Sequence, residues 1–94
     1  MIQVKDNHLW RGGIKIGHIE DNHIFDHEDK KIGYFVESEK KIFNSEGKNI
    51  GHILGDFIVV PGSNSKIRIE DNLEEVNGGT LSDLCRAAIR ILLG

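Results

Sequence analysis

A short pattern recurs along most of this chain and constrains its fold more than any single residue does. The segment Val4–Trp10, VKDNHLW, returns as IEDNHIF at Ile19–Phe25, and its first half returns as IEDN at Ile69–Asn72. A second signature, Ile-Gly, opens segments at Ile16, Ile32 and Ile50. Each copy is too small to bury an apolar face alone, so such copies pack side by side around a shared core.

Each copy carries two short apolar clusters around a polar turn. The turns of the first, second and fourth copies are centred on Asp6-Asn7, Asp21-Asn22 and Gly55-Asp56. Asp, Asn and Gly are the residues that primed two-residue hairpin turns require, because the central positions need a positive φ. The third copy has a wider loop at 37–41, and the fifth, at 67–76, turns charged after IEDN. We therefore expect a mostly β fold, an antiparallel meander of about five tandem hairpins over residues 1–76.

The turns that link one hairpin to the next are also polar. Asp29 occupies the place that Gly47 takes in the following copy, where Asp tolerates the left-handed region. The glycine of each Ile-Gly pair indicates a β-bulge or a close backbone approach. Strict alternation places Ile16 with His18 on one face and Ile19 on the other, which predicts apolar groups on both faces and a second covering layer.

A helix is expected at the C-terminus, over residues 80–93. Gly78-Gly79 ends the β region, and Thr80 with Asp83 three residues later is similar to a capping box. The polar residues Ser82, Asp83, Arg86 and Arg90 occupy a narrow sector of the helix. The wide apolar remainder predicts a helix packed as a plug inside the rolled sheet, with Leu84, Ala88 and Leu92 against Phe35 and Phe43. A helix shared with another subunit of a homo-oligomer is the alternative.

The size and composition limit the function. The 94 residues are enough for one domain, 1–94, and the net charge is −3 with no run of Lys or Arg longer than a pair. Nucleic-acid binding needs clustered cationic charge and is therefore disfavoured. The single cysteine, Cys85, excludes an internal disulfide. Arg86 and Arg90 interrupt the longest apolar stretch and the opening residues are polar, so we expect neither a membrane span nor a signal peptide but a soluble cytoplasmic protein.

The linkage between hairpins resembles that of a known family. IFDHEDKKIG at Ile24–Gly33 and IFNSEGKNIG at Ile42–Gly51 are similar to the repeat of the small bacterial proteins described as five-fold β-flowers. The pattern departs at Val59-Val60-Pro61 and in the fifth copy. This resemblance implies hairpin petals around an axis, and it implies no activity and no functional residues. The D-x-x-G-x-x-[IV]-G element of PRC-barrel domains is a second resemblance.

Histidines and carboxylates form the densest polar cluster of the sequence. His23, His27 and Asp26 lie close together in DNHIFDHED and are the candidate metal ligands. Zinc needs three or four such ligands at tetrahedral geometry, and the spacing does not force these side chains to converge. The repeat offers another explanation, because His8 is equivalent to His23 and His18 to His52. Surface or structural roles are therefore preferred to a metal site.

The sequence gives little support for a catalytic function. Cys85 falls on the apolar sector of the helix, and no serine has a nucleophile-elbow context. We expect a non-enzymatic protein without a cofactor that binds a protein partner or itself, with Trp10 and Tyr34 as candidate partner-binding residues because aromatics anchor interfaces. A small inhibitor or accessory protein of a mobile genetic element is consistent with the size and acidity. The alternative is a small-ligand or metal-binding module built on repeated His and carboxylate positions.

Overall fold

The computed structural model describes all residues, 1–94, and contains ten strands and two helices. The helices are α1, Ile69–Glu75, and α2, Asp83–Leu93. The strands are β1 Ile2–Lys5, β2 His8–Arg11, β3 Ile14–Glu20, β4 His23–Asp26, β5 Lys31–Val36, β6 Lys41–Asn44, β7 Asn49–Leu54, β8 Phe57–Val59, β9 Lys66–Arg68 and β10 Val76–Asn77.

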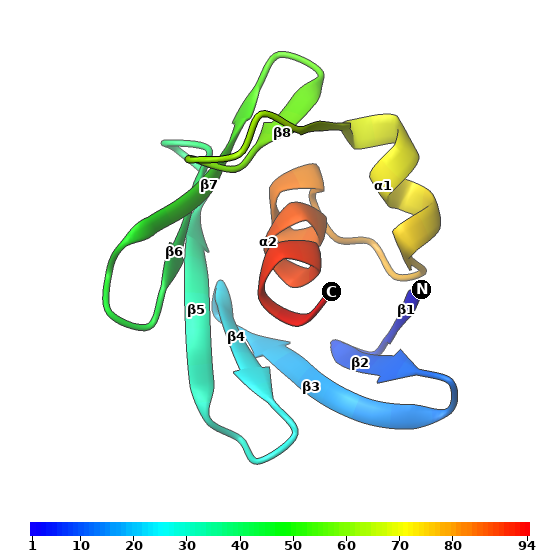
Figure 1. Cartoon of the computed structure of the whole chain (residues 1–94). Coiled ribbons are helices and arrows are strands. Elements are labelled where there is room, and N and C mark those ends of the chain that lie inside the picture. The colour runs from blue at the N-terminus through cyan, green and yellow to red at the C-terminus, as the bar shows by residue number, and fades with distance from the viewer.

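The ten strands form a single sheet that curls around α2. Each strand from β1 to β9 pairs antiparallel with the next, and β10 returns to pair in parallel with β1. Figure 1 shows the sheet wrapped around α2, with α1 spanning the gap between its two edges. The predicted mostly β meander with a C-terminal helix is therefore confirmed.

The hairpins share one register, as the repeat predicts. The inward pair of each hairpin occupies an equivalent position: Val4 with Leu9, Ile19 with Ile24, Phe35 with Ile42, and Ile53 with Ile58. These side chains belong to the core or pack against it. Asp6, Asn7, Asp21 and Asn22 all have positive φ, which confirms primed turns in the first two hairpins. In the fourth, only Gly55 of the two central residues does, as a type II′ turn requires.

Each Ile-Gly pair forms a β-bulge, and the bulge reverses the face of the sheet on which its isoleucine was expected to lie. The pairing of β2 with β3 passes from Leu9–Gly17 to Trp10–Lys15, so Ile16 has no partner, and the same shift leaves Ile32 and Ile50 unpaired. The bulged isoleucines pack against the core and do not point outward with His18. The expectation of apolar groups on both faces that need a second covering layer was therefore wrong for these positions.

The fifth copy is a helix and not a hairpin. Its IEDN begins α1 directly after β9, although the same letters form a strand end and a turn at Ile19–Asn22. The residues that follow explain the difference, since Leu73-Glu74-Glu75 favour helix whereas His23-Ile24-Phe25 favour strand. Glu70 and Asp71 in the first turn also suit the positive end of the helix dipole. β9 pairs with β8, but no strand follows to pair with its other edge, and α1 comes where that strand would begin.

The helix α2 is the plug of the curled sheet. It contacts β4, β5, β6, β7, β10 and α1, and its Leu84, Cys85, Ala87, Ala88 and Ile89 are buried. It begins at Asp83 and not at residue 80, because the N-cap is Ser82, whose Oγ accepts a hydrogen bond from the Cys85 N–H at 3.1 Å. The intramolecular plug is confirmed with a later start than predicted.

Two predicted side-chain positions in this core were wrong. Phe43 lies on the outer face of the sheet, where its ring stacks on Tyr34 at 5.1 Å between centroids. Arg86 is 8% exposed and does not lie on a solvated face. Its Nη1 donates to the Val76 carbonyl at 2.9 Å and its Nη2 to the Gly79 carbonyl at 3.3 Å. A buried guanidinium is tolerated because these backbone acceptors satisfy it.

Neither α1 nor α2 has the length and apolar character needed to cross a membrane.

Candidate interaction surface

The two ends of the molecule differ because turns of a meander alternate between them. The turns at 6–7, 21–22, 37–40 and 55–56 lie at the end where α2 begins, and the linking turns lie at the end where α2 finishes. We call the opening around the C-terminal end of α2 the mouth. The mouth is lined by the half-buried residues Ile16, Ile32, Ile50, Ile91, Leu92 and Leu93. Ile14 lies at its edge, because it pairs with Arg11, whose guanidinium reaches the Leu93 carbonyl.

The last turn of α2 reaches the sheet at the glycine of each Ile-Gly pair. A Cβ placed on Gly51 would lie 2.5 Å from Cδ1 of Ile91, and one on Gly33 would lie 2.6 Å from Cδ1 of Leu92. A Cβ on Gly17 would lie 3.2 Å from Cδ1 of Leu93 and closer still to the Phe25 carbonyl oxygen. The predicted close backbone approach is confirmed. The three glycines allow the helix end to contact three successive hairpins.

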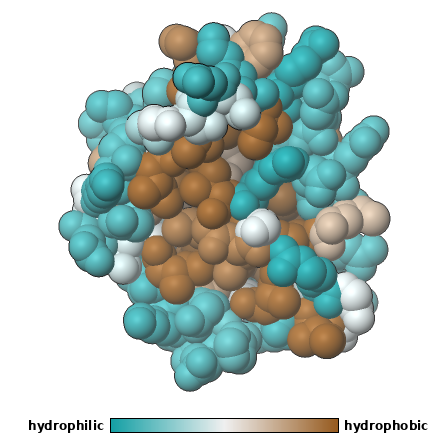
Figure 2. All heavy atoms as spheres, in the orientation of Figure 1, coloured by the Kyte–Doolittle hydropathy of each residue, from teal (hydrophilic) through white to brown (hydrophobic).

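The mouth leaves aliphatic side chains in contact with solvent. Ile14, at its edge, is 69% exposed, and the six residues that line the mouth are half-buried. Figure 2 shows hydrophobic residues gathered over the end of α2 and the neighbouring sheet, inside a hydrophilic rim. A contiguous apolar surface rimmed by polar residues is typical of a protein interaction site.

The rim of the mouth carries charges of both signs, because its linking turns hold lysines together with the carboxylates of Asp26, Glu28, Asp29 and Glu46. Arg11 points inward, and its Nη2 donates to the Leu93 carbonyl at 2.6 Å, a favourable place at the negative end of a helix dipole. The positions equivalent to Ile14 in the next two copies are Lys30 and Lys48. Lys31 lies on the outer face over the ring of Tyr34, so alternation turns Lys30 toward the mouth.

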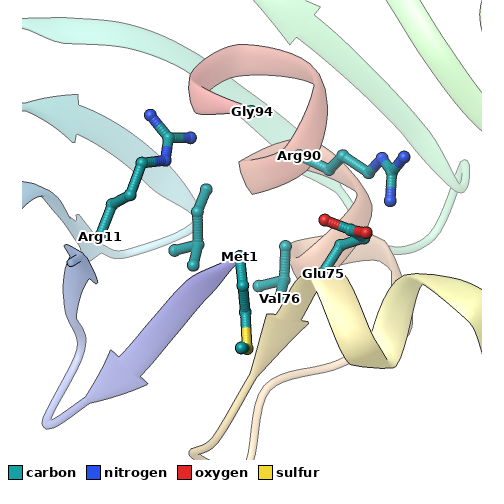
Figure 3. Close-up of a pocket in the computed structure, with 7 residues that line it drawn as sticks. Met1, Arg11, Glu75, Val76, Arg90 and Gly94 are labelled. Carbon is teal, nitrogen blue, oxygen red and sulfur yellow. The ribbon is translucent and has the colours of Figure 1, made fainter.

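A small pocket of about 170 Å³ opens at one side of the mouth. Arg11 and Arg90 flank it, and Glu75 lies beside Arg90 (Figure 3). Met1, Ile2, Val76 and Gly94 complete its lining. This volume is smaller than the cavities that hold drug-sized ligands, which exceed ~300 Å³. The pocket therefore adds charged side chains and a small depression to the mouth, and it does not form a separate ligand cavity.

Trp10 and Tyr34 lie on the outer face of the sheet and not in the mouth. Trp10 stands opposite Gln3 and Lys15, and its indole Nε1 is buried without a hydrogen-bond partner. Tyr34 packs against the ring of His23 at 5.8 Å, with Lys31 Nζ at 5.4 Å from its centroid. The two side chains are half-buried, stand on different strands and take part in cross-strand packing. The structure does not bring them together as one surface.

The candidate metal ligands also do not converge. The Asp26 carboxylate accepts hydrogen bonds from the backbone N–H groups of Lys30 and Glu28, and these bonds hold the pKa of Asp26 below its ordinary value. His27 Nε2 lies 3.6 Å from Glu28 at the turn, whereas His23 packs against Tyr34. No three His, Cys, Asp or Glu side chains of the chain lie close enough together to hold a metal ion.

The histidines instead follow the repeat. His8 pairs across strands with His18, His23 with Tyr34, and Lys41 with His52, all on the outer face. The equivalence of His8 with His23, and of His18 with His52, is therefore confirmed by the strand register. His18 also stacks on Phe25 at 4.6 Å and lies 3.5 Å from the Asp29 carboxylate. These contacts give the imidazoles a packing role.

Cys85 lies in the core and is a poor nucleophile. Burial, together with the nearby Glu37 carboxylate, raises the pKa of its thiol to about 12, although the charge of Arg86 acts in the opposite direction. The reactive species of cysteine is the thiolate, so at neutral pH this side chain remains a small apolar group.

The sequence reasoning missed the mouth. The recurring Ile-Gly pairs were a signal of this surface, but strict strand alternation predicted that their isoleucines lie on the outer face of the sheet. Comparison with protein-family models, curated proteins and solved structures finds no match for this chain.

Proposed function

We propose that this chain is a non-enzymatic binding protein that holds a macromolecular partner, another protein or a second copy of itself, at the mouth. The observation that carries the proposal is the set of seven aliphatic side chains left in contact with solvent at one end of the molecule. A monomer gains stability by burying such groups, and a surface of this kind lowers its free energy when a partner covers it.

The chemistry of the side chains supports binding over catalysis. The one thiol stays protonated inside the core, and the histidines of the outer face are engaged in cross-strand packing. The arginines at the mouth contact the end of α2 and the side chain of Asn72. Interaction surfaces combine an apolar centre with arginine and a polar rim, which is the composition of the mouth. An inhibitor or accessory protein of a mobile genetic element would work in this way.

The test compares the mouth with the outer face. A photoreactive side chain is introduced at Ile14, and separately at Tyr34, and the crosslinked partner is identified from cells that express the chain natively. Affinity for that purified partner is then measured by titration calorimetry with Ile14→Glu and with Tyr34→Gln. We expect Ile14→Glu to weaken binding at least tenfold and Tyr34→Gln to leave it nearly unchanged.

The opposite ranking would refute the mouth as the binding surface and favour the outer face with Trp10 and Tyr34. Ile14 is exposed and Tyr34 is half-buried on the outer face of the sheet, so neither substitution disturbs the core and circular dichroism spectra of the variants should match that of the parent. A variant that fails this control is replaced by Ile14→Ser, which removes the apolar contact without adding charge.

A further inference from the structure

Two histidines meet on the outer face of the sheet where the first hairpin joins the second. His8 of β2 pairs across strands with His18 of β3, and their ring centres lie 6.3 Å apart with the planes tilted by 51°. A metal ion bound through one nitrogen of each ring lies about 2.0 Å from both nitrogens, which brings the ring centres to roughly 4.5–6 Å. A small rotation of the His8 side chain therefore allows both imidazoles to bind one ion.

The remaining contacts of the two rings leave one nitrogen of each available. The buried nitrogen of His8 is Nδ1, which has no hydrogen-bond partner, so the rotation breaks no hydrogen bond and Nε2 is the atom that solvent reaches. Nδ1 of His18 lies 3.5 Å from Oδ1 of Asp29, and the ring stacks on Phe25 at 4.6 Å. A carboxylate beside Nδ1 favours the proton on that nitrogen and leaves the lone pair of Nε2 free, as it does for many metal-binding histidines.

The other two junctions between hairpins do not pair two histidines. At the equivalent register His23 faces Tyr34 between β4 and β5, and Lys41 faces His52 between β6 and β7. The repeat therefore places a ring or a cation at each of these positions, and the first junction is the one where two imidazoles are neighbours.

The carboxylate is also specific to the first junction. Asp29 has a φ of 61° in the turn after β4, and the equivalent residue in the turn after β6 is Gly47, with a φ of 82°. Gly47 stands beside Tyr34 as Asp29 stands beside His18, since a Cβ on Gly47 would lie 3.8 Å from the Tyr34 hydroxyl. Two imidazoles and a carboxylate therefore come together at this junction and not at the next.

The ligand set favours copper over zinc. Two imidazoles do not complete the tetrahedral shell of a structural zinc site, and no third His, Cys, Asp or Glu side chain lies close enough to join them. Cu²⁺ accepts tetragonal sets of nitrogen and oxygen ligands, in which water can take the other positions, and it binds most tightly among the divalent first-row metals.

We propose that His8 and His18 bind one Cu²⁺ ion through their Nε2 atoms, with Asp29 holding the orientation of His18. This site lies on the outer face of the sheet, so it goes beyond the proposed function and does not depend on the mouth. The only thiol, that of Cys85, is buried and does not compete for the ion.

The test is titration calorimetry of the untagged chain with copper(II) chloride, in a buffer that does not bind metals. The parent should bind one Cu²⁺ per chain, and His8→Gln and His18→Gln should each weaken binding at least tenfold. Asp29→Asn keeps a residue that tolerates positive φ but removes the charge, and it should weaken binding about tenfold. His23→Gln is the matched control and should bind like the parent. Zn²⁺ should bind the parent more weakly than Cu²⁺ does.

Tyr34→His tests the register by adding a site. It places a second imidazole opposite His23, at the position equivalent to His18 in the first junction. The variant should bind a second Cu²⁺ ion, more weakly than the first because Gly47 provides no carboxylate. A variant that still binds one ion would overturn the cross-strand pair as the cause of binding.

Electron paramagnetic resonance of Cu²⁺ bound to the parent needs no variant and so decides the matter if one fails to fold. The spectrum should show two imidazole nitrogens as ligands, and one nitrogen or none would overturn the site. Equal losses of affinity in His23→Gln and His8→Gln would overturn it as well, because they would place the ion elsewhere. A parent chain that binds Cu²⁺ no more tightly than His8→Gln would do the same, while the crosslinking test at Ile14 still decides whether the mouth binds a partner.

Discussion

The contact between Gly51 and Ile91 provides a direct test of how the plug helix is seated. A Cβ on Gly51 would lie 2.5 Å from Ile91 Cδ1, whereas its other neighbours, Ile42 Cδ1 and the Val59 carbonyl, would be 3.5 Å away. Gly51→Ala therefore creates one severe overlap, with the terminal methyl group of one side chain. Overpacking of this kind costs roughly 1–3 kcal/mol. Ile91→Val removes that methyl group and by itself costs about 0.5–1.5 kcal/mol.

The effects of Gly51→Ala and Ile91→Val on the free energy of unfolding should be coupled. If Ile91 Cδ1 is the obstacle, the double variant is destabilised little more than Ile91→Val alone, which gives a coupling free energy of about 1–2 kcal/mol in favour of the pair. The assay is urea unfolding followed by the fluorescence of Trp10, the only tryptophan. A destabilisation of ~2 kcal/mol would also lower the melting temperature by about 8–16 °C in a domain of this size.

Gly33 provides the contrasting case. A Cβ there would lie 2.6 Å from both Leu92 Cδ1 and the Phe43 carbonyl oxygen. The carbonyl belongs to a paired strand and cannot rotate away, so Leu92→Ala should not rescue Gly33→Ala. Additive effects within about 0.5 kcal/mol in the Gly51–Ile91 cycle would refute the seating of α2 against the Ile-Gly bulges.

Three further predictions concern the turns and the core. Asn22 has a φ of 65°, so Asn22→Val should lower the free energy of unfolding by about 1 kcal/mol or more in a urea titration, whereas Asp29→Gly, at a φ of 61°, should not lower it. Arg86→Met should cost about 1–3 kcal/mol, because the buried Val76 carbonyl and the partly buried Gly79 carbonyl lose their donor, and a thermal melt equal to that of the parent would contradict this role. Cys85 has its pKa raised from 9.0 to about 12, so the native thiol should resist Ellman's reagent at neutral pH until the chain is unfolded. Because the unfolded chain loses this proton first, the stability from the neutral thiol is complete below pH 9.0 and falls as the pH rises toward about 12, which urea titrations across that range will measure.

The turns and the hairpin register could be predicted because their causes are local. Asp6-Asn7 and Asp21-Asn22 adopt positive φ for reasons contained in the turn itself. Equal spacing of the apolar residues then fixes which of them meet, as Ile19 meets Ile24. Where the copies have the same letters and the same neighbours, the structure follows the repeat.

The remaining features depend on context that the pattern does not contain. IEDN at Ile69–Asn72 becomes helical because of the residues after it. Ile16 points inward because a single unpaired residue in a bulge reverses the alternation. Arg86 is buried because carbonyls from β10 and from the turn at Gly79 surround it, and that environment depends on the parallel pairing of β10 with β1. Such distant pairings leave no periodic signal in the sequence.

The residues of the candidate surface could likewise be predicted only in part. Trp10 and Tyr34 were selected because aromatic side chains anchor interfaces, but in this repeat they are members of cross-strand pairs. Strand alternation placed Ile16 on the outer face, whereas the bulges turn Ile16, Ile32 and Ile50 toward the core and leave them half-buried beside the end of α2. The partner-binding residues therefore could not be ranked before the register was known.

The two ends of the molecule differ because the repeat places its bulges at only one of them. The turns at the end where α2 begins have positive φ at Asp6, Asn7, Asp21 and Asn22, and at Lys40 in the wider loop. The linking turns at the other end also have a residue at positive φ, Asp29 in one copy and Gly47 in the next, and they carry carboxylates beside Lys30 and Lys48. Turn chemistry and charge therefore do not distinguish the mouth. The Ile-Gly bulge does, because each copy turns one isoleucine toward the end of α2, and the meander leaves an apolar surface there as it forms.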